Sequence, residues 1–328
     1  MLSWSWVLLL FHFQSFINST IPILLPFTKL PLVPTKTFGP EALAFDGKGQ
    51  GGPYTGTGDG RILKYQDQLV GFVEFGTTSP LRTNKVCAGT NATFPSICGR
   101  PLGLGFNFVT GLLYIADSAF GFLVLPPTGG LAKQLATAVD GVPFGFTNAL
   151  DIDQITQIVY FTDSGPIFNL GNITQIIQSK DNSGKLFKYE PKTGQFQLIL
   201  KGLFGPAGVA VSADGSYLLI SELIAFRITR FWLKGPKANT AEVLINLKGY
   251  PDNIKRNAVG DFWVAVNVIK GQKTIPEAVK INAALGVVTE SRDLSAQFNN
   301  IPISEYQEYR DRFFVGSLSQ SFVGKYGI

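Results

Sequence analysis

Residues 208–221 read GVAVSADGSYLLIS, and this stretch decides the fold. Two short runs of aliphatic residues flank Asp214-Gly215, which is the pattern of two antiparallel strands joined by a tight turn. Five further units of this kind have first strands that contain Leu43, Leu102, Leu150, Ile254 and Ile303. Together with Val209, these positions are separated by 59, 48, 59, 45 and 49 residues, a spacing that suits four-stranded propeller blades. The sequence therefore predicts an all-β protein, a six-bladed β-propeller that forms a single domain over residues 21–328.

The composition supports this prediction. Among 328 residues there are 36 Gly, 19 Pro and 27 Phe, which favours short strands and turns over long helices. Hydrophobic residues make up 45% and charged residues 16%, so a disordered chain is excluded. The net charge is only +5 and the basic residues are dispersed, so no nucleic-acid partner is expected. Propellers bind ligands at one mouth of the central channel, and the expected partner is a small molecule.

The N-terminal segment indicates entry into the secretory pathway. Met1 to Thr28 contains no Asp, Glu, Lys or Arg, and residues 6–11 form an apolar centre. We interpret residues 1–20 as a cleaved signal peptide, and an uncleaved anchor is the alternative. Polar residues interrupt the apolar run before the roughly 20 residues that span a bilayer. No later stretch is long enough, so no stable transmembrane anchor is expected.

The cysteines and two asparagines fit a lumenal protein. Cys87 and Cys98, the only cysteines, are expected to pair as a disulfide in an oxidising compartment; two buried thiols are the alternative. Asn91-Ala92-Thr93 and Asn172-Ile173-Thr174 are acceptor patterns for glycosylation of Asn91 and Asn172.

Histidine provides an exclusion. The only one is His12, within the predicted signal, so the mature chain lacks histidine-based triads, dyads and zinc sites. Any hydrolysis must rest on a carboxylate or on metal-bound water.

Several ordered motifs carry a family resemblance. They include Gly39-Pro40-Glu41, residues 59–64 (DGRILK), residues 98–103 (CGRPLG), residues 113–117 (LYIAD) and residues 251–256 (PDNIKR). From about residue 36 to the end, the chain resembles the plant strictosidine synthase-like family. The resemblance implies a six-bladed propeller in the secretory route, in the vacuole or outside the cell.

The last blade bears on synthase activity. The synthase condenses tryptamine with secologanin, and a Glu just before a short strand handles the protons. Ser304 takes that place here and Glu305 follows. A neutral hydroxyl cannot act as the carboxylate base, so we expect no strictosidine synthase activity. A shift of one residue would make Glu305 the base, whereas the plainer interpretation places Glu305 and Glu308 on a solvated strand or turn.

A more distant resemblance links the chain to paraoxonases and gluconolactonase-type hydrolases, which hold Ca²⁺ at the channel mouth. Calcium prefers oxygen ligands, and the matching candidates here are Glu41, Asn148, Asp252 and Asn253. In such a site Asp252 would be the nucleophile or base. Where those hydrolases place an Asn and an acidic residue, this chain has Ala207 and Ala149.

These candidates also have plainer interpretations. The two asparagines can cap turns, and Glu41 and Asp252 can pair with Arg100, Lys255 or Arg256. Phe144, Phe146 and Phe204 are candidates for an apolar pocket near the mouth.

Three functions therefore remain open from the sequence. The first is a metal-assisted hydrolase of small esters or lactones. The second is an enzyme that condenses an amine with an aldehyde. The third is a non-enzymatic propeller that binds a metabolite, in which the two alanines mark a lost site.

Overall fold

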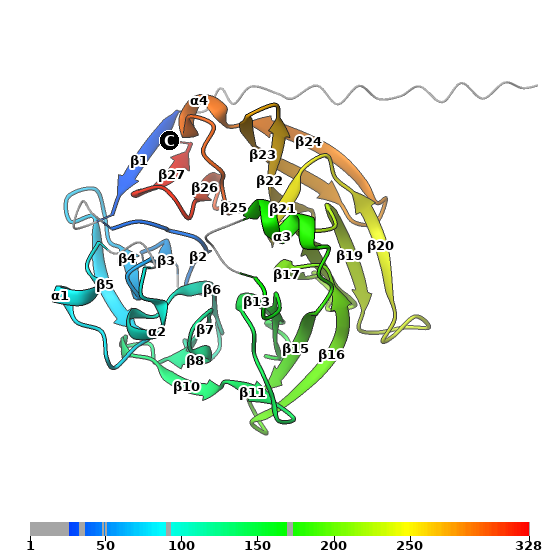
Figure 1. Ribbon diagram of the computed structural model, residues 1–328, viewed down its shortest axis with the longest axis horizontal. Coiled ribbons are helices and arrows are strands. Elements are labelled where there is room, and N and C mark those ends of the chain that lie inside the picture. The colour runs from blue at the N-terminus through cyan, green and yellow to red at the C-terminus, as the bar shows by residue number, and fades with distance from the viewer. Residues whose placement is uncertain are drawn as a thin grey trace, which may run out of the picture.

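A computed structural model describes residues 26–32, 37–47, 49, 51–89, 93–168 and 173–327. Within these residues, six sheets stand in a ring around a central axis, as Figure 1 shows in a view along that axis. The prediction of a six-bladed β-propeller is therefore confirmed.

Each blade is an antiparallel sheet whose strands follow one another from the centre outward. Blade 1 contains β2 (Leu43–Ala44), β3 (Tyr54–Gly56), β4 (Arg61–Tyr65) and β5 (Phe72–Thr77), with β9 (Gly130–Leu131) parallel to β5. Blade 2 contains β6 (Pro101–Phe106), β7 (Leu113–Asp117), β8 (Gly121–Leu125) and β10 (Lys133–Ala136). Blade 3 contains β13 (Thr147–Ile152), β14 (Val159–Asp163), β15 (Gly184–Glu190) and β16 (Gln195–Leu203).

The second half of the ring repeats this order. Blade 4 contains β17 (Pro206–Val211), β18 (Tyr217–Glu222), β19 (Arg227–Trp232) and β20 (Ala241–Asn246). Blade 5 contains β21 (Tyr250–Arg256), β22 (Phe262–Lys270), β23 (Lys273–Asn282) and β24 (Val287–Asp293). Blade 6 contains β25 (Glu305–Tyr309), β26 (Arg312–Gly316) and β27 (Phe322–Tyr326). A small hairpin of β11 (Ala138–Val139) and β12 (Val142–Pro143) lies between blades 2 and 3 in the sequence.

The N-terminal strand closes the ring. Strand β1 (Phe27–Pro31) pairs antiparallel with β27 and is the outermost strand of blade 6. The first and last strands of the chain therefore share one sheet, which ties the two ends of the propeller together.

The core lies between adjacent blades, because neighbouring sheets face each other. On β17, Val209 and Val211 pack in the cluster shared with blade 3, whereas Ala210 packs in the cluster shared with blade 5. Strand β18 repeats this, with Leu218 toward one side and Leu219 toward the other. The alternation that predicted the strands thus serves two buried faces, because side chains of a strand alternate between the faces of its sheet.

Helices and loops gather where the inner strands begin, and we call this end of the ring the mouth. Helix α3 (Ile173–Ser179) lies in the long connection between β14 and β15. Short helices α1 (Asn84–Cys87) and α2 (Pro95–Cys98) lie between blades 1 and 2 in the sequence, and α4 (Ser295–Phe298) precedes β25. In the part of the chain that is described, no helix is long and apolar enough to cross a membrane.

Candidate functional site

Three blades meet at the mouth through a chain of hydrogen bonds. The backbone N–H of Asn253 donates to the carbonyl of Ser304 at 3.0 Å, and Ser304 Oγ donates to the carbonyl of Glu41 at 3.0 Å. The amide Nδ2 of Asn253 in turn donates to Oε1 of Glu41 at 2.9 Å. All three residues are buried. Glu41, Asn253 and Ser304, which the sequence singled out separately, therefore form one polar cluster.

Glu41 carries an unsatisfied oxygen. Within the described residues, its Oε2 is buried and has no hydrogen-bond partner. Burial raises the pKa of this carboxyl well above its usual value, and the charges of Asp252 and Glu305 raise it further. The more distant charges of Arg100 and Lys255 act in the opposite direction. A buried carboxylate of this kind needs a proton or a cation.

Asp252 is the second carboxyl of the mouth. It is half-buried, and its pKa is raised well above the usual value by burial and then by the charge of Glu305. Neither Asp252 nor Glu41 has a basic partner within 4.0 Å in the part of the chain that the structure describes. The expected pairings with Arg100, Lys255 or Arg256 are therefore absent there, since Lys255 pairs with Glu305 and Arg256 donates to the carbonyl of Val211.

Asn148 lies on blade 3 and makes different contacts. Its Nδ2 donates to Ser164 Oγ at 3.0 Å, and Ser164 Oγ donates to the carbonyl of Pro206 at 2.9 Å. Ala207, which follows Pro206 at the start of β17, is completely buried. Blade 4 thus contributes a methyl group at the position where the sequence already lacks the asparagine of the hydrolases it distantly resembles.

Glu305 is not solvated, so the plainer interpretation of this residue was wrong. Its side chain is 0% exposed. Oε1 accepts from the backbone N–H of Leu43 at 2.9 Å, and Oε2 lies 3.4 Å from Lys255 Nζ. Burial raises the pKa of Glu305 to about 7, although Lys255 and the Leu43 N–H oppose the rise. Glu305 is buried because β25 is the inner strand of blade 6 and lies between blades 5 and 1.

Glu308 and Ser304, which lie close to Glu305 in the sequence, both make contacts to other blades. Glu308 Oε2 accepts from Trp263 Nε1 at 2.9 Å and from Asn257 Nδ2 at 3.0 Å, so it joins blade 6 to blade 5 and does not stand free in solvent. Ser304 precedes this strand and donates its hydroxyl to the backbone carbonyl of Glu41.

Arg100 is a site residue that the sequence suggested only as a pairing partner. It is 1% exposed, and its Nη1 donates to the carbonyl of Gly39 at 3.1 Å. Gly39 has φ +78°, and a Cβ there would lie 2.6 Å from Arg100 Nη2, so only glycine lets the guanidinium pack this closely. The motif residues Gly39 and Arg100 thus belong to one contact beside Glu41.

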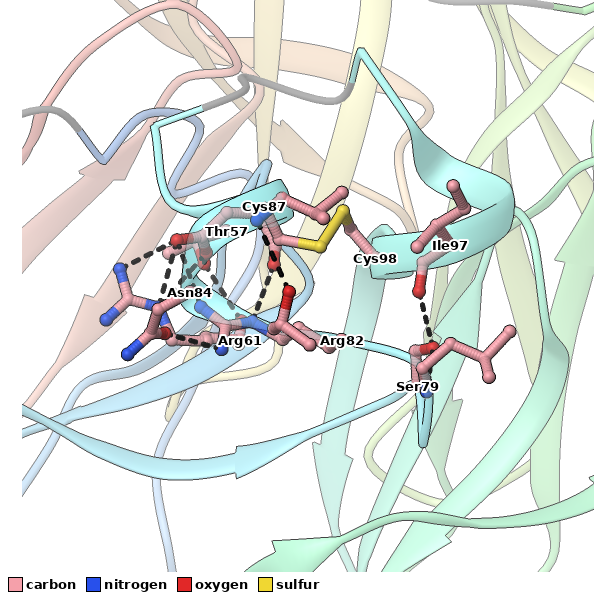
Figure 2. The surroundings of a disulfide bond; sticks show 12 residues. Thr57, Arg61, Ser79, Arg82, Asn84, Cys87, Ile97 and Cys98 are labelled. Atoms are coloured by element: carbon pink, nitrogen blue, oxygen red, sulfur yellow. Dashed lines mark hydrogen bonds and ion pairs between the residues drawn. A yellow bond between two sulfur atoms is a disulfide. The ribbon is translucent and has the colours of Figure 1, made fainter.

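The predicted disulfide between Cys87 and Cys98 is present and joins α1 to α2. Figure 2 shows that Arg61, Arg82 and Ser79 lie around it. Arg82 Nε donates to the carbonyl of Asp59 at 2.9 Å, and Ser79 Oγ donates to the carbonyl of Ile97 at 2.5 Å. These contacts fix the segment that leads from the disulfide into Arg100.

An apolar cluster occupies the other side of the mouth. Its buried members come from blades 2 to 5 and from α3, namely Leu102, Phe146, Phe168, Ile176, Ala207, Leu223, Ile224 and Tyr250. In Figure 1, α3 lies toward the centre of the ring near β17 and β21. Phe146 and Phe204 belong to this cluster, whereas Phe144 makes edge-to-face contacts with Phe161 and Phe187 between the blades. The mouth therefore combines the polar cluster of blades 5, 6 and 1 with an apolar cluster that extends from blade 2 to blade 5.

The residues at the mouth differ in the oxygen atoms that they offer to a calcium ion. Glu41 offers an unpartnered buried oxygen and Asp252 a neighbouring carboxyl, which suits a hard divalent cation. Asn253 is engaged through its amide nitrogen, and Ala207 offers no side-chain oxygen. No group of three or more His, Cys, Asp or Glu side chains that could hold a metal occurs among the residues described. The candidate oxygen donors at the mouth are therefore the carboxyl groups of Glu41 and Asp252 and the amide oxygen of Asn253, and Ala207 adds none.

The N-terminal segment and both predicted glycosylation sites, Asn91 and Asn172, lie outside the described residues. Those expectations remain predictions.

The ring of six sheets places the chain among the six-bladed β-propellers. A bacterial gluconolactonase from Xanthomonas campestris has the same fold, with a TM-score of 0.63, 13% identity and coverage of 92% of this chain and 88% of that one. A calcium-binding protein, regucalcin, from Agrobacterium tumefaciens gives a TM-score of 0.63, 13% identity and coverage of 93% and 95%.

Sequence comparison narrows the class to a family. A family model for strictosidine synthase matches residues 148–236. Strictosidine synthase-like protein 11 of Arabidopsis thaliana is 42% identical over 97% of this chain and 96% of its own length. Strictosidine synthase of Catharanthus roseus is 35% identical over 91% and 86%, respectively. The chain belongs to the strictosidine synthase-like family.

Proposed function

We propose that this family member is a hydrolase of small esters or lactones and that it lacks strictosidine synthase activity. The observation that carries the proposal is the unpartnered Oε2 of Glu41, buried beside Asp252 at the mouth. An acidic pair at the edge of an apolar cluster suits a substrate with an apolar body and a polar carbonyl. The gluconolactonase and the calcium-binding protein that share the fold are consistent with this chemistry.

Each residue has a separate task in this proposal. Glu41, Asp252 and Asn148 would hold a calcium ion, which would supply a Lewis acid for the carbonyl oxygen when bound. Asp252, the more exposed of the two carboxyls, accepts the proton of the attacking water. Asn253 orients Glu41 through Oε1, and Ser304 fixes the Glu41 backbone. The apolar cluster excludes water from one side of the substrate.

The test is turnover of a panel of aryl acetates and aliphatic lactones with calcium and with a chelator. We expect Asp252→Asn and Glu41→Gln to lower turnover at least a hundredfold and Ser304→Ala to retain most of it. A panel without turnover by the wild-type protein, or full turnover by Asp252→Asn, would refute the assignment.

A condensing enzyme is the second candidate, and Glu305 favours it. This carboxyl has a pKa of about 7, in the range of a general base at neutral pH. It lies one residue from the family's catalytic position. Incubation with tryptamine and secologanin separates the candidates, because strictosidine formation that disappears in Glu305→Ala would identify a condensing enzyme. Our proposal predicts no product.

A non-enzymatic binding protein is the third candidate, favoured by the burial of Ala207 beneath Ile176 of α3. Small-molecule binding at the mouth without turnover on the panel would support it.

We also propose a secretory route that ends in the vacuole or outside the cell. The apolar N-terminal segment and the Cys87–Cys98 disulfide support it. In plant cells we expect a mass shift that glycosidase removes and that Asn91→Gln with Asn172→Gln abolishes. Cytosolic, unglycosylated protein would contradict this route.

A further inference from the structure

A second hollow lies away from the mouth, between blades 4 and 5. It has a volume of about 470 Å³ and lies between β20 and one face of blade 5. The blade 5 strands β22 and β23 have 9 and 10 residues, whereas β18 and β19 of blade 4 have 6 each. Blade 5 therefore extends past its neighbour and forms a wall that blade 4 does not cover.

The floor of this groove is apolar. Val266, Val268 and Val279 line it from blade 5, and Ile245 and Leu247 line it from β20. The three valines are buried within the cluster shared by the two blades. The volume falls within the range of small-molecule sites, which are mostly apolar with few polar groups.

The charged groups that line the groove are two lysines and one acid, and Asn246 and Ser291 are its uncharged polar residues. Lys248 follows β20, and Lys270 ends β22. Neither lysine has an acidic partner within 4.0 Å among the described residues. The acid, Glu277, is already engaged, since its Oε2 accepts from Ser291 Oγ at 3.1 Å. The groove therefore offers cationic groups without an ion-pair partner.

Strand direction places both lysines at one end. Strand β20 leads into β21, which begins at the mouth, and β22 returns antiparallel to β21 toward the same side. Val287 lines the opposite end, just after the turn between β23 and β24. The two lysines thus lie at the mouth-side end of the groove, the valines line the rest of it, and Glu277 with its partner Ser291 lies beside Val266.

We propose that this groove binds an amphipathic carboxylate, with the anionic head at Lys248 and Lys270 and an alkyl or aromatic tail along the valines. Unpaired ammonium groups attract a carboxylate through charge-assisted hydrogen bonds, and the tail removes apolar surface from water. This site is separate from the mouth and does not depend on the hydrolase proposal.

The test is calorimetric titration of the full chain with decanoate, hexanoate and decan-1-ol. We expect one saturable site for decanoate, with hexanoate and decan-1-ol each at least tenfold weaker. The double variant Lys248→Glu with Lys270→Glu is expected to weaken decanoate at least tenfold. Val287→Phe changes an exposed side chain that lines the groove and is expected to weaken it at least fivefold by filling space.

Lys192→Glu is the matched control, because Lys192 is exposed in the turn between β15 and β16, outside the groove. Decanoate should bind this variant as it binds the wild type. The proposal is wrong if decanoate fails to bind the wild type at millimolar concentration, or if decan-1-ol binds equally well. It is also wrong if both groove variants fold and bind decanoate with unchanged affinity.

Discussion

The side-chain amide of Asn253 donates to Oε1 of Glu41 at 2.9 Å across 212 positions of sequence. This bond joins blade 5 to blade 1 and leaves Oε2 of Glu41 buried without a hydrogen-bond partner among the described residues. The hydrogen bond orients the buried carboxylate but does not neutralise its charge, so the charge lowers the stability of the folded protein. A proton, a bound cation or a substitution can each neutralise this charge. Each of them changes the free energy of unfolding in a different way.

Replacing Glu41 with Gln should therefore stabilise the cation-free protein. Gln keeps the acceptor for Asn253 but removes the buried charge, so we expect the free energy of unfolding at pH 8 with chelator to rise by roughly 1–3 kcal/mol. Calcium should stabilise the wild type and leave this variant unchanged. Urea denaturation with calcium and with chelator measures both effects. A Glu41→Gln variant less stable than the wild type with chelator would show that Oε2 has a favourable partner.

Glu305 predicts a pH dependence of stability. Its pKa in the fold is raised to about 7 from the usual 4.5, so between these values the folded chain binds more protons than the unfolded chain. Stability then decreases as pH rises through this window, by about 3 kcal/mol in total for this group. Below the usual pKa both states are protonated, and above 7 the loss is complete.

The measurement is the unfolding free energy from pH 4 to pH 8.5 for the wild type and Glu305→Gln. The variant should flatten the curve and keep the Leu43 bond, since a Gln oxygen still accepts. Glu74→Gln, at a half-exposed carboxyl on β5, serves as control and should leave the wild-type slope in place. A wild-type curve that rises through this window, or equal slopes in wild type and Glu305→Gln, would contradict the argument.

The fold could be predicted because its signal is local. Val209 and Val211 alternate with Ala210 along one strand, and the same pattern recurs in each blade. The site could be predicted only as a set of residue types at blade starts. Whether Glu305 is buried or solvated depends on how β25 sits between two other blades, which no local pattern contains. Arg100 was similarly hidden, because its role depends on close packing against Gly39, 61 positions away.

Replacing Ala207 with Asn is expected to change both the stability of the protein and its affinity for calcium. Its side chain is completely buried with Ile176 of α3, so Ala207→Asn places an amide in an apolar cluster. Without cation we expect a loss of about 1–3 kcal/mol, the cost of an unsatisfied buried polar group. With calcium the new oxygen adds a ligand, and affinity should increase severalfold over the wild type. Ala207→Val, which adds volume without an oxygen, is the control for overpacking. Calorimetric titration with calcium measures the affinity, and thermal unfolding measures the stability. Equal calcium affinity in Ala207→Asn and Ala207→Val would show that blade 4 does not contribute to the cation site.

We expect the disulfide to stabilise helices α1 and α2 and, through them, the position of Arg100. Cys87 and Cys98 close a loop of sequence separation 11, and the loop-entropy account gives a stabilisation of about 3 kcal/mol for a loop of this size. The double variant Cys87→Ser with Cys98→Ser should lower the melting temperature accordingly. Hydrogen exchange should increase at α1 and α2 and at the Arg100 amide, which donates to Asp117 Oδ2 at 2.8 Å. Arg82→Met tests the loop without touching the disulfide, since it removes the bond to the Asp59 carbonyl. If exchange at Arg100 stays at the wild-type rate in the double serine variant, Asp117 and Gly39 alone hold the arginine, and the disulfide stabilises the loop without ordering the mouth.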